Sequence, residues 1–248
     1  MKAQRLVPFF LFLVVLSLSA TALADGNLLA NPGFEGDYTQ YGSFRTAIVA
    51  EGWTPWWQVQ TKRDADWQNR MPEFKAAAPY ESRIHQGENA QQVFTAYGTH
   101  AGGVYQVVDG LTPGSTVRFT IWGHAWAGEG DDPDRSEEGG PMHMMVGIDP
   151  TGGTSPYSTR VVWSEDLNPL DEWTLFQVEA VVRGSAVTVF TRSAPEYPTL
   201  HNDVYWDEAS LTVIAGAPEP TPAPDRYFSY HHGVDVGESP ASGPALTR

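Results

Sequence analysis

The sequence predicts an all-β fold, an antiparallel β-sandwich, jelly roll or barrel. Apolar and polar residues alternate through runs of strand length, as in 115–126 and 173–182. Turn-forming segments such as "DGLTPGS", "DPTGG" and "RGS" separate these runs. Between residues 25 and 214, no stretch keeps a 3.6-residue apolar repeat for three turns without Gly or Pro. Many short, half-buried strands are typical of the predicted class.

Three runs justify the strands one by one. In 115–126, Val117, Phe119 and Ile121 share one face of the predicted strand. In 173–182, the same pattern places Phe176 and Val178 on one face, and 186–193 is rich in β-branched residues. Each run therefore offers one side to a core.

The last run, "HNDVYWDEASLTVI" at 201–214, places a carboxylate among apolar residues. Counting by twos from its end, Val213, Leu211, Ala209, Asp207 and Tyr205 share a face, which predicts that Asp207 points into the core. An unpaired buried carboxylate costs several kcal/mol. We therefore expect a metal ion at Asp207; alternatively, Asp207 is not deeply buried, or it caps backbone N–H groups at the sheet edge.

The N-terminus has the pattern of a secretion signal. Lys2 and Arg5 precede the apolar run 6–20, and Ala22-Leu23-Ala24 forms a small-x-small cleavage site. We expect residues 1–24 to be a signal peptide, cut before Asp25, which predicts a secreted or extracytoplasmic protein with no membrane insertion after cleavage. The chain has no cysteine, so it cannot form disulfides.

The mature chain divides into a folded unit and a tail. We expect one β-sandwich domain at 25–214 and a Pro-rich linker with a disordered tail at 215–248, because prolines recur at 218, 220, 222 and 224. The formal net charge of −15 disfavours nucleic acid and anionic polymers as partners. Oligomeric state is not encoded in these features.

Five blocks occur in an order that resembles a known family. They are "NLLANPGFEG" (27–36), "GW" (52–53), "IHQGENAQQV" (84–93), "GVYQVVDGLTPGSTVRFTIW" (103–122) and "VYWDEASL" (204–211). The set resembles carbohydrate-binding modules of the family four and nine type, which are galactose-binding-like jelly rolls. The stretch "VGIDPTGGTSPYS" departs from that pattern and is similar to uncharacterised exported bacterial proteins.

The resemblance implies a structural calcium ion. Its ligands would be the carbonyl of Gly33, the carboxylates of Glu35 and Asp207, and the carbonyl of Asn89. Gln86 stands where some members have an acid, which leaves less negative charge for the ion.

Aromatic and amide side chains suggest where a sugar would bind, because sugars offer C–H faces to rings and hydroxyls to polar groups. The candidate ligand-binding residues are Trp56, Trp57, Trp67, Gln106, Trp126 and Tyr197. Trp53 is assigned to the core, and at most one of Trp56 and Trp57 can face it from a strand. Alternatively, most of these tryptophans fill the space between sheets, and Gln106 satisfies a neighbouring strand.

The acidic insert 128–141 lacks the spacing of a calcium loop and is interpreted as a surface loop that could fold over one end of the sheet. No nucleophile elbow, HExxH motif or phosphate loop is present. The best enzymatic alternative is the cluster Arg192, Glu196, His201, Asn202 and Asp203.

These observations predict a secreted, non-catalytic carbohydrate-binding module that recognises a polysaccharide or glycan. The alternatives are a structural or adhesive cell-envelope protein and, third, a secreted glycoside or ester hydrolase.

Overall fold

The computed structural model describes residues 26–218, and strands dominate them. The predicted signal peptide, the cleavage site and the tail from residue 219 on lie outside these residues. The helical content of the described part is the 3-10 turn η1 (Glu81–Arg83). Within that part, no helix combines the length and apolarity needed to cross a membrane.

Two five-stranded antiparallel sheets form a β-sandwich of the jelly-roll type, which confirms the predicted fold class. The first, here called the β12 sheet, has the order β10-β7-β12-β5-β4. Its strands are β4 (Glu73–Ala76), β5 (Gln91–Thr95), β7 (Thr116–Gly128), β10 (Thr174–Val181) and β12 (His201–Ala215).

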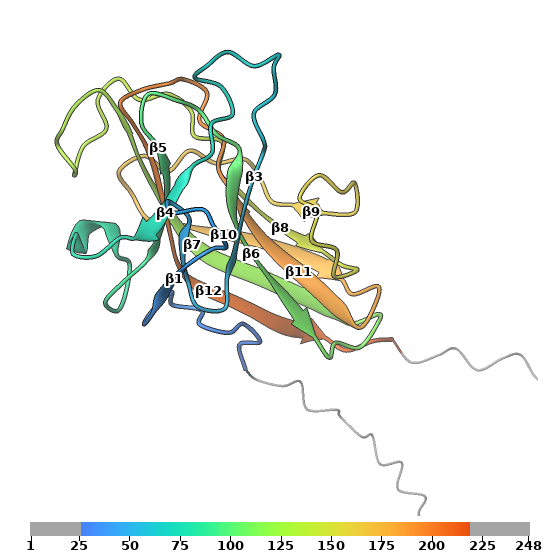
Figure 1. Ribbon diagram of the computed structural model, residues 1–248. Coiled ribbons are helices and arrows are strands. Elements are labelled where there is room, and N and C mark those ends of the chain that lie inside the picture. The colour runs from blue at the N-terminus through green and yellow to red at the C-terminus, as the bar shows by residue number, and fades with distance from the viewer. Residues whose placement is uncertain (1–25, 219–248) are drawn as a thin grey trace, which may run out of the picture. The chain divides into compact units, whose positions relative to one another are not determined.

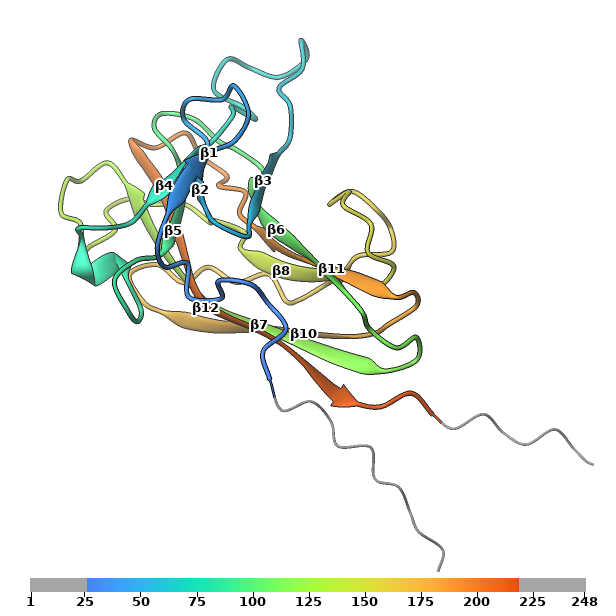
Figure 2. The same ribbon diagram turned by 60° about the horizontal axis from the view of Figure 1, so that its bottom comes forward.

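The second, the β11 sheet, has the order β3-β6-β11-β8-β9. Its strands are β3 (Thr54–Trp57), β6 (Gly102–Asp109), β8 (Met145–Asp149), β9 (Val162–Trp163) and β11 (Ala186–Arg192). A small two-stranded sheet, β1 (Tyr38–Gln40) with β2 (Ile48–Ala50), lies beside β4 (Figure 1 and Figure 2). Figure 2 shows β6, β8 and β11 in one layer and β7, β10 and β12 in the other.

The core lies between the two sheets, on the faces that the alternation predicts. Phe119 and Ile121 of β7 and Trp206 of β12 are fully buried there, and Phe176 of β10 is 1% exposed. Trp53 also belongs to this core, where its ring stacks on Phe34 at 4.6 Å, so its assignment is confirmed.

The predicted face of Asp207 is wrong, because β12 contains a bulge. The register of β12 against β7 shifts between Asp207 and Ser210, and Glu208 has a φ of +50°. The extra residue reverses the alternation, so Val204 and Trp206 face the core before the bulge while Ala209 and Leu211 face it afterwards. Asp207 therefore shares the outer face of the β12 sheet with Tyr205.

Asp207 is nevertheless fully buried, because the segment after η1 covers it. The backbone N–H groups of His85 and Gln86 donate to its Oδ2, at 2.9 and 3.1 Å. Its Oδ1 accepts from the N–H of Glu208 at 2.7 Å. The carboxylate thus caps backbone donors, as one alternative expected, but it does so fully buried on the central strand β12 and not at the sheet edge.

Candidate functional site

The outer face of the β12 sheet carries aromatic and polar side chains in two adjacent rows. Cross-strand pairing aligns β4, β5, β12 and β7 in each row. One row consists of Lys75, Gln92, Tyr205 and His124. The other contains Phe94, Asp203 and Trp126. Side chains alternate between the two faces of a strand, and the neighbours of these residues in the sequence point into the core. The residues of both rows therefore all lie on the outer face.

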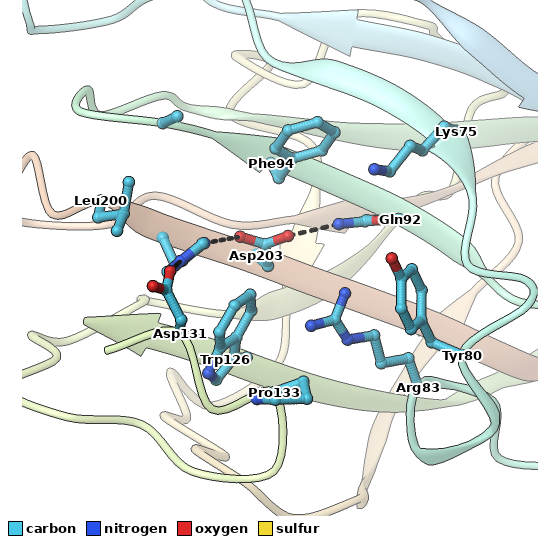
Figure 3. Close-up of a pocket in the computed structure, with 12 residues that line it drawn as sticks. Lys75, Tyr80, Arg83, Gln92, Phe94, Trp126, Asp131, Pro133, Leu200 and Asp203 are labelled. Atoms are coloured by element: carbon cyan, nitrogen blue, oxygen red, sulfur yellow. Dashed lines mark hydrogen bonds and ion pairs between the residues drawn. The ribbon is translucent and has the colours of Figure 1, made fainter. Parts of the chain in front are cut away.

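A groove of about 390 Å³ lies over these rows (Figure 3). The segment around η1 forms one wall, and the acidic insert, through Asp131 and Pro133, contributes to the wall at the other end. The insert therefore folds over the end of the sheet. The groove is lined by Lys75, Tyr80, Arg83, Gln92, Phe94, Ala96, Trp126, Asp131, Pro133, Leu200, His201 and Asp203.

Arg83 enters the groove from η1 and packs among aromatic rings. Its guanidinium carbon lies 4.6 Å from the ring centroids of both Tyr80 and Trp126, and 5.5 Å from that of Tyr205. Such contacts stabilise a cation by about 0.5–2 kcal/mol each, depending on desolvation. Arg83 is 7% exposed, whereas the ring of Tyr80 is 51% exposed and open to the groove.

Trp126 lines the groove, but neighbouring side chains cover most of its ring. His201 stacks on its indole at 3.9 Å and 27°, and the Arg83 guanidinium also packs on the indole. Its Nε1 donates to the carbonyl of Arg135 in the acidic insert at 3.2 Å. Only 5% of Trp126 is exposed, so the ring orients its neighbours and leaves little surface for a ligand.

Asp203 is the buried acid of the groove floor, and it is 4% exposed. Its Oδ1 accepts from the side-chain amide of Gln92 and from the Tyr205 hydroxyl, the latter at 3.3 Å. Burial raises the pKa of Asp203, while His201, Arg83 and these hydrogen bonds oppose the rise. His201 Nδ1 lies 3.8 Å from its Oδ2.

Several polar atoms at the groove have no hydrogen-bond partner among residues 26–218. They are Arg83 Nε, Gln92 Oε1 and His201 Nε2, all buried. Asp131 Oδ1 lies 3.5 Å from His201 Nε2, but the pair does not form a hydrogen bond. Since buried polar groups are normally satisfied, these atoms are suited to meet a bound ligand or ordered water.

The predicted tryptophans of β3 lie away from this groove. Trp57 faces the main core, where it packs against Phe74. Trp56 lies on the outer face of the β11 sheet, is 7% exposed, and is covered by the loop that carries Tyr157 and Val161. Only one of the two faces the core, as expected.

The other predicted ligand residues are dispersed. Trp67 is 38% exposed in the loop between β3 and β4, and Tyr197 is 52% exposed in the loop before β12. Gln106 is buried. Its side-chain Oε1 accepts from Ala30 N at 2.7 Å, and its Nε2 donates to the carbonyls of Ala30 and Gly52 at 2.9 and 3.0 Å. Of the six candidates, Trp126 lines the groove.

The predicted metal residues meet around the segment after η1. Glu35 Oε1 accepts from the N–H groups of Glu88 and Asn89, at 2.8 and 3.2 Å, next to the donors that bind Asp207. Gly33 lies beside Glu208 and Glu35. A Cβ atom placed on Gly33 would be 3.2 Å from Glu208 Oε1 and 3.5 Å from Glu35 Cγ. The expected proximity of the first segment and the last strand is therefore present.

The acids Glu35, Asp207 and Glu208 form no ion pair with a Lys or Arg within residues 26–218, although backbone N–H groups donate to Glu35 and Asp207. Burial raises the pKa of Asp207 to about 7, and the Glu208 carboxylate adds to the rise although three backbone donors oppose it. Burial also raises the pKa of the nearby Tyr38 hydroxyl, and Asp207 and Glu35 raise it further. Within residues 26–218, no three His, Cys, Asp or Glu side chains are placed to hold a metal by themselves.

The hydrolase cluster is divided by the structure. His201 and Asp203 line the groove, whereas Asn202 points to the opposite side of β12 and binds the carbonyls of Gly98 and Tyr197. Glu196 lies 3.8 Å from His143, at a separate surface site. Arg192 lies at the end of β11, in the other sheet, so the five residues do not form one constellation.

Sequence reasoning missed most of the groove residues. Gln92 and Phe94 share one face of β5, and this period-two signal was available in the sequence. Arg83 and Tyr80 gave no such signal, because they belong to an irregular segment whose path depends on tertiary contacts.

The chain matches no protein-family model and no curated protein. Among solved structures it is similar to TmCBM61 in complex with β-1,4-galactotriose, at 18% identity and a TM-score of 0.47 over 76% of this chain and 99% of that one. It is also similar to the CBM22-1 xylan-binding domain from Paenibacillus barcinonensis Xyn10C, at 14% identity and 0.43 over 75% and 93%.

A third similar structure is a Stig cyclase, Fisc, from Fischerella sp. TAU in complex with an indole compound. Its identity is 17% and its TM-score 0.48, over 77% of this chain and 98% of that one. At such identities the likeness concerns the fold alone.

Proposed function

We propose that the protein is an exported carbohydrate-binding module whose ligand occupies the groove on the β12 sheet. The observation that carries the proposal is the groove itself, which combines an open ring at Tyr80 with donors and acceptors that have no partner in the part of the chain that the structure describes. Sugars present C–H faces and hydroxyl groups that both donate and accept, so they match this mixture. Export is supported by the N-terminal sequence pattern.

The groove places the binding residues differently from the tryptophan face expected around β3. Tyr80, Arg83, Gln92 and Asp203 would contact the sugar, and Trp126 would hold Arg83 and His201 in place. A ligand face at Trp56, Trp57, Trp67 and Tyr197 stays a prediction.

Binding to a panel of insoluble polysaccharides and soluble oligosaccharides, measured by pull-down and calorimetry, tests the proposal. Tyr80→Ala is expected to weaken binding about tenfold, because it removes the open ring. The matched control is Tyr157→Ala, since Tyr157 is 62% exposed but belongs to the loop over the β11 sheet. Loss of binding in the control alone, or silence across the panel, would contradict the proposal; silence would favour the adhesive alternative.

Acid–base catalysis is a second candidate, favoured by the raised pKa of the buried Asp203 and by His201 beside it. Turnover of chromogenic glycosides or esters that is lost in Asp203→Asn would support it. Binding without turnover would leave the non-catalytic function for those substrates.

We also propose that a structural calcium ion joins Glu35 and Asp207. The support is the donor chemistry: the carboxylates of Glu35 and Glu208 lie beside Gly33, the fully buried Asp207 precedes Glu208, and no Lys or Arg within residues 26–218 forms an ion pair with these acids. Because side chains alone do not complete a site, backbone carbonyls such as those of Gly33 and Asn89, together with water, would supply the remaining oxygens.

A further inference from the structure

Arg83 is a nearly buried cation that has no acidic partner within the described residues. It is 7% exposed, and its guanidinium packs on Tyr80, Trp126 and Tyr205. Within residues 26–218, the guanidinium forms no ion pair and no hydrogen bond, and its Nε is buried without a partner. The three rings hold the planar guanidinium in position but accept no hydrogen bond from its N–H groups.

A shortage of acids does not explain this arrangement. The chain has 30 Asp and Glu residues and only 15 Lys and Arg residues, so a partner could readily have been placed beside Arg83. The buried acid of the groove, Asp203, is instead hydrogen bonded to Gln92 and Tyr205. Asp203 is near enough to interact electrostatically with Arg83 but does not occupy its N–H donors, which stay available to an external anion.

A second cation lies at the same end of the groove. Lys75 is the cross-strand neighbour of Gln92, and its ammonium lies 4.7 Å from the ring centroid of Phe94, with no acid paired to it within residues 26–218. Figure 3 shows the Arg83 guanidinium, the Lys75 ammonium and the Tyr80 hydroxyl toward one end, while Asp131 and Leu200 occupy the other. The groove is therefore divided into a basic end and an acidic end.

We propose that the groove selects a glycan bearing a carboxylate, a uronic acid residue, whose carboxylate pairs with Arg83 beside Lys75 while its hydroxyls meet Gln92 and Asp203. This inference rests on the proposed carbohydrate-binding function. The planar guanidinium fork matches a planar carboxylate with two parallel hydrogen bonds.

The ligand would carry its acid groups sparsely. The net charge of −15 repels a polyanion at long range, whereas contact with two local cations acts within a few ångströms. A mostly neutral chain with an occasional uronic acid satisfies both conditions.

Matched tetrasaccharides test the inference. Neutral trisaccharides of xylose, glucose and galactose, each capped with one glucuronic acid, are compared at 150 mM salt with the carboxyl-reduced forms, in which the cap is glucose. Calorimetry on the full chain should show that the acid form binds about tenfold more tightly, the effect of one charge-assisted bidentate contact. Arg83→Gln should abolish that preference, so that this variant binds the acid form no more tightly than it binds the neutral form.

Arg83 could instead serve only to hold the η1 segment on the sheet, and the same variants separate that role. Arg83→Lys retains the charge without the fork and should keep only part of the preference. If Arg83→Gln lowers the melting temperature yet keeps the preference for the acid form, or if wild type binds both forms equally, the inference is overturned while carbohydrate binding stands. If no member of either series binds, both fall together.

Discussion

At the scale of single residues, His100 joins the two sheets through a buried hydrogen-bond chain. Its Nδ1 lies 3.0 Å from Thr95 Oγ1 on β5, and its Nε2 lies 2.8 Å from Ser193 Oγ beyond β11. Because the Thr95 hydroxyl donates to the Gly98 carbonyl at 2.6 Å, it must accept from Nδ1–H. His100 therefore carries a proton at Nδ1, and in the neutral form that burial favours, its Nε2 accepts from the Ser193 hydroxyl.

The buried position of His100 predicts a pH-dependent stability. Burial, with a smaller effect of Arg192, lowers its pKa from 6.5 to about 3. The unfolded chain takes up a proton near pH 6.5 but the folded chain does not, so the stabilisation is complete above that pH and is lost as the pH falls toward 3. Relative to His100→Gln, the unfolding free energy of wild type should fall by about 1.4 kcal/mol per pH unit between pH 6 and pH 4.

Chemical denaturation at several pH values measures this difference. His143→Gln is the control, because His143 is an exposed residue and its replacement leaves His100 in place. A constant difference between wild type and His100→Gln over this range would contradict the buried neutral state.

At the scale of elements, alternation predicted the strands well and failed where a strand is irregular. The faces of Val117, Phe119 and Phe176 could be predicted because β7 and β10 pair in uninterrupted register through these positions. In β12 the bulge adds one residue, and no composition signal marks it: Glu208 occupies a left-handed conformation that usually favours Gly or Asn. The core face was therefore assigned one residue out of phase before position 208.

The candidate site, too, could be predicted where its residues lie on regular strands and not where they lie on irregular segments. Strand positions such as Gln92 and Phe94 follow from alternation, but Arg83 and Tyr80 reach the groove through an irregular segment held by cation–π contacts. Such contacts join residues far apart in sequence and leave no periodic signal. The tryptophans of β3 and of the loop after it therefore did not indicate where the groove lies.

The bulge gives an element-scale prediction. Deleting Glu208 should remove the extra residue and turn either Leu211 or Trp206 away from the core, because a one-residue slip exchanges the two faces. Exposing one large apolar side chain and burying polar neighbours should abolish cooperative unfolding. Glu208→Gly keeps the bulge and removes the steric cost that a Cβ atom carries at a φ of +50°. This variant should change the free energy of unfolding by no more than about 1 kcal/mol.

Thermal unfolding followed by circular dichroism compares the two variants. A deletion variant that melts cooperatively at the wild-type temperature would show that the register of β12 is not fixed by this residue.

At the scale of the whole molecule, the beginning of the described chain is bound along its last strand. The side chain of Asn27 donates to the Ala209 carbonyl and accepts from Leu211 N, at 2.8 and 3.0 Å, and Leu28 N donates to the Leu211 carbonyl at 2.9 Å. Ala209 N in turn donates to the carbonyl of Pro32 at 2.8 Å. In a chain without cysteine, these contacts hold the two ends together without a covalent link.

The proposed calcium ion would reinforce this junction, and it gives the last prediction. An ion that binds only the folded state at 100 times its dissociation constant adds about 2.7 kcal/mol, which for a domain of this size raises the melting temperature by roughly 5–10 °C. Wild type should therefore melt that much lower in EGTA than in calcium. The response should vanish in Glu35→Gln, which removes a charged oxygen ligand, and persist in Glu179→Gln, whose acid pairs with Arg118 on the exposed face of the sheet. Equal melting temperatures of wild type in EGTA and in calcium would show that the hydrogen bonds from Asn27, His85 and Gln86 hold the junction unaided, with the buried charge of Asp207 left to its backbone donors.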